Sequence, residues 1–256
     1  MKNYLNKIGI AVLFLSLFLV NEGKAQEKNG QLSKNNHIVP KDNSFNQDND
    51  GLDQDRVSFG LKAGYAAFTL RGSGLSAISP AGMPRQLSGD HFGAEVNTGF
   101  SAHFSLKHEV SVVQEGAFVK MEDNEEKAFD SKFRSVYLNI APISPTFKMG
   151  GFQVFAGPYL GLLIQASIQR KDESGNLYTD KRIFGDPNQE GGYAQKMDAG
   201  FLGGLGYEFK NGINISARYI HGMTAVLEHT ENTGGQDKIF NRGFSVSLGY
   251  SFTGRR

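Results

Sequence analysis

The sequence predicts an all-β protein, an eight-stranded antiparallel up-and-down transmembrane β-barrel, and three features lead to this prediction. Apolar residues alternate with small or polar residues over long stretches, as they do in a strand with two different faces. Long and short connections alternate along the chain. Charged residues fall on the face opposite the apolar one, which fits a barrel whose outer wall contacts lipid.

The first 56 residues are expected to lie outside the barrel. Residues 1–25 have the pattern of a secretory signal peptide, because Lys2 and Lys7 flank the start of the apolar run 8–20 and Gly23-Lys24-Ala25 supplies small residues for cleavage. Residues 26–56 are polar and nearly free of aromatic residues, so they cannot bury enough apolar area to offset chain entropy. We therefore predict a disordered periplasmic leader at 26–56.

The alternating pattern begins at Val57 and predicts a barrel over residues 57–252, followed by a short C-terminal overhang at 253–256. The pattern is clearest in the last strand, where Phe244, Val246, Leu248, Tyr250 and Phe252 alternate with glycine and serine. The eight predicted strands cover residues 57–70, 91–105, 107–121, 133–148, 152–170, 195–209, 212–223 and 241–252.

Connections of two kinds separate these strands. Strands two and three are predicted to meet at Leu106-Lys107, and short turns at 149–151 and 210–212 join strands four to five and six to seven. The last of these turns contains Asn211-Gly212, a strong hairpin signal. The other four connections, about 71–90, 122–132, 171–194 and 224–240, are long. Tight periplasmic turns and long extracellular loops are typical of outer-membrane barrels.

Composition excludes several classes of protein. The chain has 256 residues, a net charge of +1 and no cysteine, so disulfides, thiolate metal sites, cysteine nucleophiles and a cysteine-linked lipid anchor are ruled out. The nearly neutral charge predicts no nucleic-acid partner. After the N-terminus, no stretch reaches the roughly 18 apolar residues of a spanning helix. The six histidines are scattered, and we predict no metal site.

Several segments of this chain follow one another in a familiar order: F-G-L-K-A-G-Y at 59–65, Y-L-N-I-A-P at 137–142, F-A-G-P-Y-L-G-L-L at 155–163, D-A-G-F-L-G-G-L-G-Y-E at 198–208 and S-L-G-Y-S-F at 247–252. Their order and spacing over about 57–252 resemble the outer-membrane β-barrel (porin family) proteins of Bacteroidetes-type Gram-negative bacteria. The resemblance implies a barrel akin to the small outer-membrane protein A and X class, located in the cell outer membrane. It implies no catalytic residues. It also implies that the barrel-assembly machinery reads the aromatic end at Tyr250 and Phe252.

Seven charged residues are predicted to point into the barrel: Lys62, Glu95, Glu109, Glu115, Asp198, Glu208 and Arg218. An eight-stranded barrel has an interior just wide enough for side chains to fill, and buried charges need partners. We therefore predict an interior polar network of salt bridges and hydrogen bonds. The alternative is a lining that selects ions, with a weak cation preference because acidic residues are in excess.

Two weaker patterns remain. The segment Asn46-x-Asp48-x-Asp50-Gly51 imitates the start of a calcium loop but lacks a glutamate at the twelfth position. His221, with Glu228 and Thr224, is the nearest approach to the catalytic set of a barrel enzyme that modifies lipid, but no serine completes it. We predict neither a catalytic nor a cofactor-binding nor a metal site.

The predicted function is that of a non-enzymatic outer-membrane protein with a structural or adhesive role. Its expected partners are outer-membrane lipid, the barrel-assembly machinery and an extracellular ligand bound through loops 71–90 and 171–194, because loops on a rigid scaffold commonly carry binding. A small-solute porin is the alternative, and a lipid-modifying enzyme is less favoured. The alternative fold is a soluble lipocalin-like barrel, which would bury the apolar faces and leave the charged faces in water.

Overall fold

The computed structural model describes residues 57–123, 125–181, 196–226 and 238–253. The predicted signal peptide, leader and calcium-like segment therefore lie outside the described residues. The described strands are β1 (Val57–Gly72), β2 (Arg85–Gly99), β3 (Phe104–Glu122), β4 (Ala128–Met149), β5 (Phe152–Lys171), β6 (Leu177–Asp180), β7 (Met197–Glu208), β8 (Ile213–Gly222) and β9 (Ile239–Thr253). A single turn of helix, α2 (Leu75–Ile78), follows β1. In this part of the chain, no helix has the length and hydropathy needed to cross a membrane.

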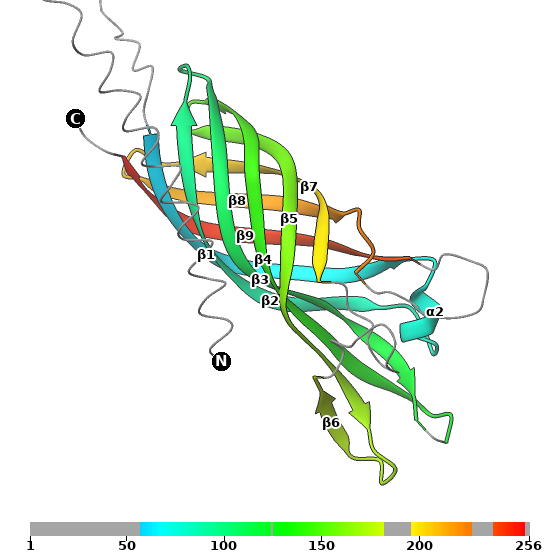
Figure 1. Cartoon of the computed structure of the whole chain (residues 1–256). Helices are drawn as coiled ribbons and strands as arrows, with labels where there is room; N and C mark the ends of the chain where they lie inside the picture. Colours follow the sequence, from blue (N-terminus) through cyan, green and yellow to red (C-terminus); the bar gives the residue numbers. More distant parts are fainter. Residues whose placement is uncertain (1–56, 124, 182–195, 227–237, 254–256) are drawn as a thin grey trace, which may run out of the picture. The chain divides into compact units, whose positions relative to one another are not determined.

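Eight of the described strands close into a barrel (Figure 1). Neighbours in the ring follow the order β4-β3-β2-β1-β9-β8-β7-β5, and β5 pairs back with β4. The pairings around the ring are antiparallel. Strand β6 lies outside the ring and extends the far end of β5 as a hairpin, from Ile168 paired with Asp180 to Lys171 paired with Leu177. The predicted fold, an eight-stranded antiparallel barrel, is confirmed.

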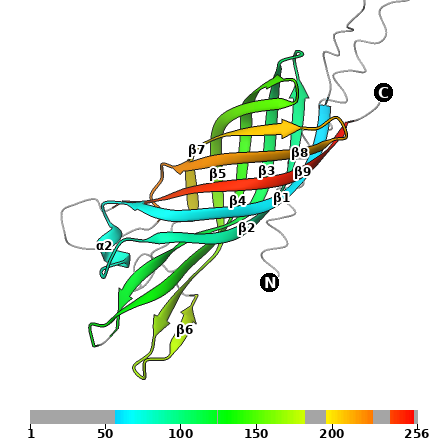
Figure 2. The same ribbon diagram turned by 180° about the vertical axis from the view of Figure 1, so that it is seen from behind.

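The first and last strands of the barrel pair with each other and form the seam that closes it. Their register runs from Ser58 opposite Thr253 to Gly72 opposite Ile239, and Figure 2 shows β9 lying between β1 and β8. Thr253 is therefore a paired residue of β9 and not part of an overhang, while 254–256 lie outside the described residues. Both ends of the barrel lie at the same rim, which also carries the short turns and is called the short-turn end below.

Two of the three short turns lie where the sequence places them. The turn between β4 and β5 is Gly150-Gly151, with φ of 58° and 89°. The two-residue hairpin turns whose twist matches that of the strands require a positive φ at both central residues. Glycine adopts a positive φ without steric cost. The turn between β7 and β8 closes through the Gly212 amide, which donates to the Phe209 carbonyl at 3.0 Å.

The predicted turn at Leu106-Lys107 is wrong, because both residues lie inside β3. The turn is 100–103, closed by the Phe100 amide, which donates to the Phe104 carbonyl at 2.9 Å. The Ser101 hydroxyl oxygen also accepts a hydrogen bond from the Phe104 amide at 3.0 Å. This turn contains neither glycine nor proline, and Phe100, Ala102 and Phe104 continue the alternation through it, so the periodicity hides it.

The strands at the opposite rim, called the long-loop end, extend further than predicted. Strand β2 begins at Arg85, and β3 and β4 remain paired as far as Glu122 opposite Ala128. The predicted connections 71–90 and 122–132 are correspondingly shorter, and 171–194 contains β6. The pairing of β2 with β3 shifts its register between Gln86 and His91. Such an irregularity lets β2 continue beyond the segment in which apolar and polar residues alternate.

The outer wall carries the exposed apolar side chains of the alternating strands. Phe59, Leu61 and Tyr65 of β1 are exposed, as are Phe244, Val246, Leu248, Tyr250 and Phe252 of β9. Aromatic pairs ring the short-turn end, with centroid distances of 5.3 Å for Phe104–Phe147, 4.9 Å for Tyr207–Phe209 and 4.8 Å for Tyr250–Phe252. An apolar band edged by aromatic residues is the surface that a membrane barrel presents to lipid.

Candidate functional site: the barrel interior

Five charged side chains fill the interior near the short-turn end, and this set is called the charge cluster: Lys62, Glu95, Lys107, Glu109 and Arg218. The Lys62 Nζ lies 3.3 Å from Glu95 Oε2 and also pairs with Glu109. The Lys107 Nζ lies 3.7 Å from the same Glu95 oxygen, and Arg218 Nη1 lies 2.7 Å from Glu109 Oε1. All five side chains are at most 7% exposed, so each charge depends on its partners rather than on water.

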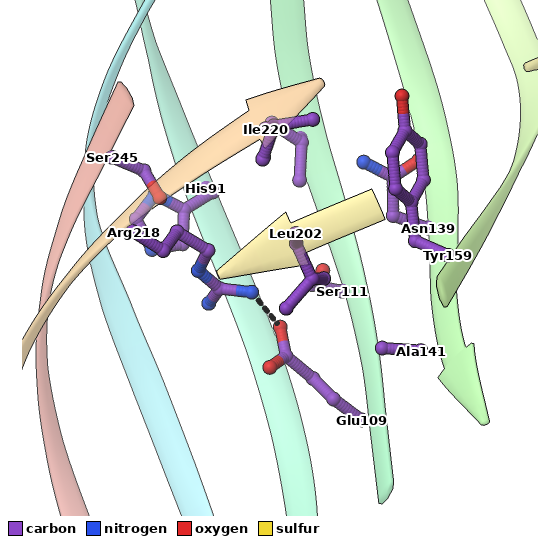
Figure 3. Close-up of a pocket in the computed structure, with 11 residues that line it drawn as sticks. His91, Glu109, Ser111, Asn139, Ala141, Tyr159, Leu202, Arg218, Ile220 and Ser245 are labelled. Carbon is purple, nitrogen blue, oxygen red and sulfur yellow. Dashed lines mark hydrogen bonds and ion pairs between the residues drawn. The ribbon is translucent and has the colours of Figure 1, made fainter. Parts of the chain in front are cut away.

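The pair of Arg218 and Glu109 crosses the lumen. Arg218 lies on β8 and Glu109 on β3, two strands four places apart in the ring of eight. Figure 3 shows the guanidinium extending from β8 to the carboxylate on β3. A salt bridge between opposite walls obstructs the middle of the barrel, which is narrow enough for side chains to span.

Lys107 belongs to this cluster although the sequence prediction does not include it. The prediction placed residue 107 at a turn, and the corrected turn at 100–103 puts it on the inner face of β3 between Ser105 and Glu109. Its ammonium also lies 4.7 Å from the centroid of the Phe155 ring. The signal that identifies it is the unbroken inward series of alternate residues from Ser105 to Ser111.

The next layer toward the long-loop end is apolar and is called the middle apolar layer. Its buried side chains are Ala66, Phe68, Val113, Ala141, Phe155, Tyr159, Leu202 and Ile220. These residues lie on the inner face, where simple alternation leads one to expect polar side chains. Apolar residues are accepted there because a small barrel holds no water column, so its interior packs like an ordinary core.

A second polar layer lies beyond the middle apolar layer and is called the acidic tier. It contains Glu115 of β3 and Asp198 of β7, which are 2% and 1% exposed. Asp198 Oδ2 accepts hydrogen bonds from the Tyr159 hydroxyl at 3.0 Å and from Asn241 Nδ2 at 3.1 Å. Its Oδ1 accepts from the Thr224 hydroxyl at 2.9 Å. Glu115 Oε1 accepts from Asn139 Nδ2 at 3.1 Å.

The long-loop end of the interior is closed by a second apolar cluster, called the outer plug. Its buried members are Leu70, Ala117, Val119, Phe133, Ala166, Ile168, Val226 and Ile239. Leu75 and Ile78 of α2 pack against it from the loop. Four layers of side chains thus follow one another along the interior: charge cluster, middle apolar layer, acidic tier and outer plug.

The seven charged residues predicted to point inward are therefore found in three places. Lys62, Glu95, Glu109 and Arg218 meet in the charge cluster, and Glu115 and Asp198 lie in the acidic tier. Glu208 stands apart at the short-turn rim and is only partly buried. There its Oε2 accepts a hydrogen bond from Gln153 Nε2 at 2.7 Å and lies 3.7 Å from Lys148 Nζ.

A small cavity lies between the charge cluster and the acidic tier. His91, Arg218 and Ser245 line one side, and Asn139 and Tyr159 line another, as Figure 3 shows. It has room for about one water molecule. His91 Nε2 lies 2.7 Å from Ser247 Oγ, within hydrogen-bond distance. A cavity of this size does not form a passage.

The two described residues considered for enzymatic chemistry, His221 and Thr224, make separate contacts. His221 is exposed on the outer wall, where its ring lies 6.2 Å from that of Tyr219. Thr224 instead donates its hydroxyl hydrogen to Asp198, and Glu228 lies outside the described residues. Across the described ranges, no group of three or more His, Asp or Glu side chains is placed to hold a metal ion.

At the long-loop end, Asp123 organises the tip between β3 and β4. Its Oδ2 accepts from Lys171 Nζ of β5 at 3.0 Å, and its Oδ1 accepts from the amides of Glu125 and Lys127 at 3.1 and 2.9 Å. The hydrogen bond from Lys171, together with those amide donors, holds the pKa of Asp123 below its usual range. This carboxylate therefore links the amides of Glu125 and Lys127 to Lys171 of β5.

The predicted assembly residues lie at the seam. Tyr250 and Phe252 point outward from β9 and lie opposite Leu61 and Phe59 of β1. Their side chains are 45% and 52% exposed. They are thus accessible at the short-turn rim.

The chain is similar to several solved structures of low sequence identity. The solved structures that resemble the chain include the surface protein NspA of Neisseria (12% identity, 76% of this chain and 97% of that chain, TM-score 0.44). They also include the attachment invasion locus protein Ail of Yersinia pestis (13%, 76% and 98%, 0.38) and the outer membrane protein OprG of Pseudomonas aeruginosa (12%, 78% and 97%, 0.37). No curated protein matches the chain.

The family model described as the outer membrane protein beta-barrel domain matches residues 31–228, which is more than half of the chain. The match and the closed barrel with an apolar outer wall lead to the same location, the outer membrane. The chain belongs to the outer membrane protein β-barrel domain family.

Proposed function

We propose that this protein is a non-conducting outer-membrane scaffold that binds a partner through the hairpins at its long-loop end. The observation that carries this proposal is the filled interior, in which the charge cluster, two apolar layers and the acidic tier occupy the lumen in succession. A barrel that passes no solute acts through its surfaces. Because long loops of outer-membrane barrels face outside, the long-loop end is the surface available to partners.

Two hairpins extend this end of the barrel. The β3–β4 hairpin continues to Glu122 and Ala128, and β5–β6 continues to Lys171 and Leu177 (Figure 1). Leu177 and Tyr178 of β6 are 57% and 41% exposed at this position. Successive side chains of a strand point to opposite faces, so both faces of the hairpin carry an exposed apolar side chain. Aromatic side chains in particular supply much of the energy of binding interfaces.

The described strands change the bounds of the two loops that are predicted to bind a ligand. The predicted loop 171–194 keeps its place in the proposal through the β5–β6 hairpin, and its residues 182–194 lie outside the described residues. The predicted loop 71–90 contributes mainly through 73–84, because β2 already begins at Arg85. Met83 in that segment is 69% exposed.

The solute-porin alternative is less favoured because the pair of Arg218 and Glu109 crosses the lumen and the outer plug closes it a second time. The enzyme alternative is less favoured because His221 is exposed on the outer wall, whereas Thr224 donates a hydrogen bond to the buried Asp198 inside the barrel. The porin and the enzyme alternatives each predict assay results that differ from those expected of a binding scaffold.

The first test measures ion conductance of the purified protein in planar lipid bilayers. The proposal expects no channel steps above those of protein-free bilayers, whereas steady single-channel steps would support the porin alternative. The second test measures retention of cells that display the protein on surfaces coated with fibronectin or mucin. The variant Leu177→Ser/Tyr178→Ser should lose retention, and Met223→Ser, which removes an exposed apolar side chain elsewhere at this end, serves as the matched control.

Equal retention by the wild type and the β6 variant, above that of cells without the protein, would contradict binding through β6. Retention no higher than that of cells without the protein on both coatings would contradict adhesion to this class of glycoprotein. Folding of each variant is checked by the heat-dependent gel migration of the outer-membrane fraction, so a failure to fold is distinguished from a loss of binding.

A further inference from the structure

The acidic tier holds two carboxylates between two apolar layers. Along the inner face of β3, Val113 of the middle apolar layer precedes Glu115, and Ala117 of the outer plug follows it. Asp198 on β7 lies in the same tier and is bonded to Tyr159 and Asn241. Both carboxyl groups are therefore separated from bulk water on each side along the barrel axis.

Neither carboxylate has a basic partner among the described residues. The buried lysines and arginine of the interior, Lys62, Lys107 and Arg218, form their salt bridges with Glu95 and Glu109 in the charge cluster. The hydrogen-bond donors around Asp198 and Glu115 are neutral hydroxyls and amides. A buried carboxylate without a counter-charge is unfavourable unless a cation or a proton neutralises it.

The tier also contains oxygen atoms that lack hydrogen-bond partners. Buried oxygens without a partner in the described structure include Glu115 Oε2, Ser135 Oγ, Asn139 Oδ1 and Asn241 Oδ1. Ser135 lies directly opposite Glu115 in the pairing of β3 with β4. These residues are at most 7% exposed. The Asn139 and Asn241 amides are bonded through their nitrogens to Glu115 and Asp198. Because buried polar atoms are nearly always satisfied, the unpartnered oxygens of these amides and of Glu115 are candidate ligands.

We propose that the acidic tier binds one hard divalent cation of the Ca²⁺ type, held by Glu115 with the amide oxygens of Asn139 and Asn241. Carboxylate, amide and hydroxyl oxygens are the ligands that such cations prefer, and the tier offers no sulfur or imidazole. Asp198 supplies the second negative charge, so the formal charge of the two carboxylates balances the cation. The unpartnered oxygens are then ligands rather than defects.

The position of the tier determines when the cation binds. The outer plug closes one side, and the middle apolar layer and the pair of Arg218 and Glu109 close the other. Asn241 is on β9, which pairs with β1 to close the seam, so the ligand set is complete only in the closed barrel. The cation therefore enters while the barrel folds, and afterwards exchanges slowly.

The test refolds the full chain in detergent micelles with Tb³⁺, a luminescent substitute for Ca²⁺. The chain has no tryptophan, and Tyr137 and Tyr159 are buried beside the tier, so tyrosine excitation reports Tb³⁺ bound there. The proposal expects luminescence from wild type, and it expects this luminescence to fall when Ca²⁺ is also present during refolding. Glu115→Gln should weaken Tb³⁺ binding by about tenfold or more, since it removes a charged ligand and keeps the shape.

The matched control is Glu208→Gln, the same substitution of a partly buried carboxylate at the short-turn rim, and it should leave Tb³⁺ binding unchanged. Asn139→Leu is a second variant that removes a proposed ligand without removing a charge, and it should also weaken binding. Luminescence that is equal in wild type, Glu115→Gln and Asn139→Leu would place Tb³⁺ elsewhere in the chain and overturn the proposal.

A second measurement separates a cation from a proton. The unfolding temperature of the refolded wild type should be higher when refolding takes place with Ca²⁺ than with a chelator, and this difference should disappear in Glu115→Gln. If neither Ca²⁺ nor the chelator changes the unfolding temperature, while Glu115→Gln matches wild type, the carboxyl group is neutralised by a proton and the proposal is wrong.

Discussion

Arg218 Nη1 and Glu109 Oε1 lie 2.7 Å apart although their strands, β8 and β3, are on opposite sides of the barrel. Two neighbouring strands of a sheet bring side chains together through their backbone register. These two strands share no backbone hydrogen bonds in the described sheet, so only closure of the ring brings the two charges into contact. The pair therefore belongs to the barrel as a whole rather than to any hairpin.

Removing one partner of this pair should destabilise the barrel strongly. Glu109→Ala leaves Arg218 without its carboxylate and Lys62 with only Glu95, and a buried charge stripped of its partner typically costs about 3–5 kcal/mol. The double variant Glu109→Leu/Arg218→Met should recover much of that loss. Equilibrium urea unfolding in micelles, followed by circular dichroism, measures both. A double variant that is less stable than either single variant would contradict the coupling.

Gly64 should be intolerant of any side chain. A Cβ at this position would lie 1.9 Å from the Val246 carbonyl oxygen and 2.7 Å from the Ser247 Cα, both on β9 across the seam. Gly64→Ala should therefore open the contact of β1 with β9 and cost about 1–3 kcal/mol or more. Gly203→Ala is the control, because a Cβ there meets nothing closer than 3.7 Å. The fraction of protein showing heat-dependent gel migration reports closure, and equal fractions for the two variants would refute the expectation.

Phe252 should matter for assembly more than for stability. It is exposed on the outer wall at the short-turn end, and its ring packs edge-on against Tyr250 at 4.8 Å. We expect Phe252→Ala to lower the amount of folded protein in the outer membrane, because the barrel-assembly machinery is proposed to read this end. Phe244→Ala, on the same strand but away from the short-turn rim and similarly exposed, is the control. Quantitative blotting of outer-membrane fractions should separate them, and equal loss would argue against a specific signal.

Phe68 should be a core residue that does not gate conduction. Its side chain is fully buried in the middle apolar layer, so Phe68→Ala should destabilise the barrel by about 3–5 kcal/mol. Conductance in planar bilayers should stay absent, because the pair of Arg218 and Glu109 still obstructs the lumen. Channel steps in this variant alone would show that the apolar layer, and not the charged pair, is the barrier.

The stability of the β3–β4 hairpin tip should depend on pH through the protonation of Asp123. Its pKa is lowered, so its hydrogen bonds to Lys171 and Lys127 stabilise the tip fully above the ordinary aspartate pKa and are lost as the pH falls through the lowered value. The Lys127 amide resonance should therefore titrate below the usual range for aspartate. Asp123→Asn should abolish this titration. A midpoint at the ordinary value would contradict the proposed contacts.

The alternation of residues made most of the fold predictable. The seam strand from Gly243 to Phe252 and the glycine turn at Gly150-Gly151 follow from local rules, because side-chain period and backbone conformation are properties of short segments. The turn at 100–103 was missed because Ser101 stabilises it with a side-chain hydrogen bond, for which the sequence offers no glycine or proline signal. Because the predicted turn lies at Leu106-Lys107, the prediction does not include Lys107 among the inward-pointing residues.

The layers inside the barrel could not be predicted for a different reason. Alternation assigns Phe68 and Leu70 of β1 to the same face as Lys62, but it does not say that residues from eight strands align into apolar and polar levels. That alignment depends on the stagger of the strands around the ring, which is a property of closure. The separation of Glu115 from Glu109 therefore becomes visible only in three dimensions.

The charges at the centre of the barrel also bear on how the chain folds. Glu109 and Arg218 are 109 positions apart in the sequence, and each loses its hydration as the walls come together. A half-closed intermediate would carry the desolvated Arg218 without its carboxylate and would be penalised relative to both the open and the finished states. Such a penalty makes closure an all-or-none event. The barrel should therefore close in a single cooperative step once β9 has paired with β1.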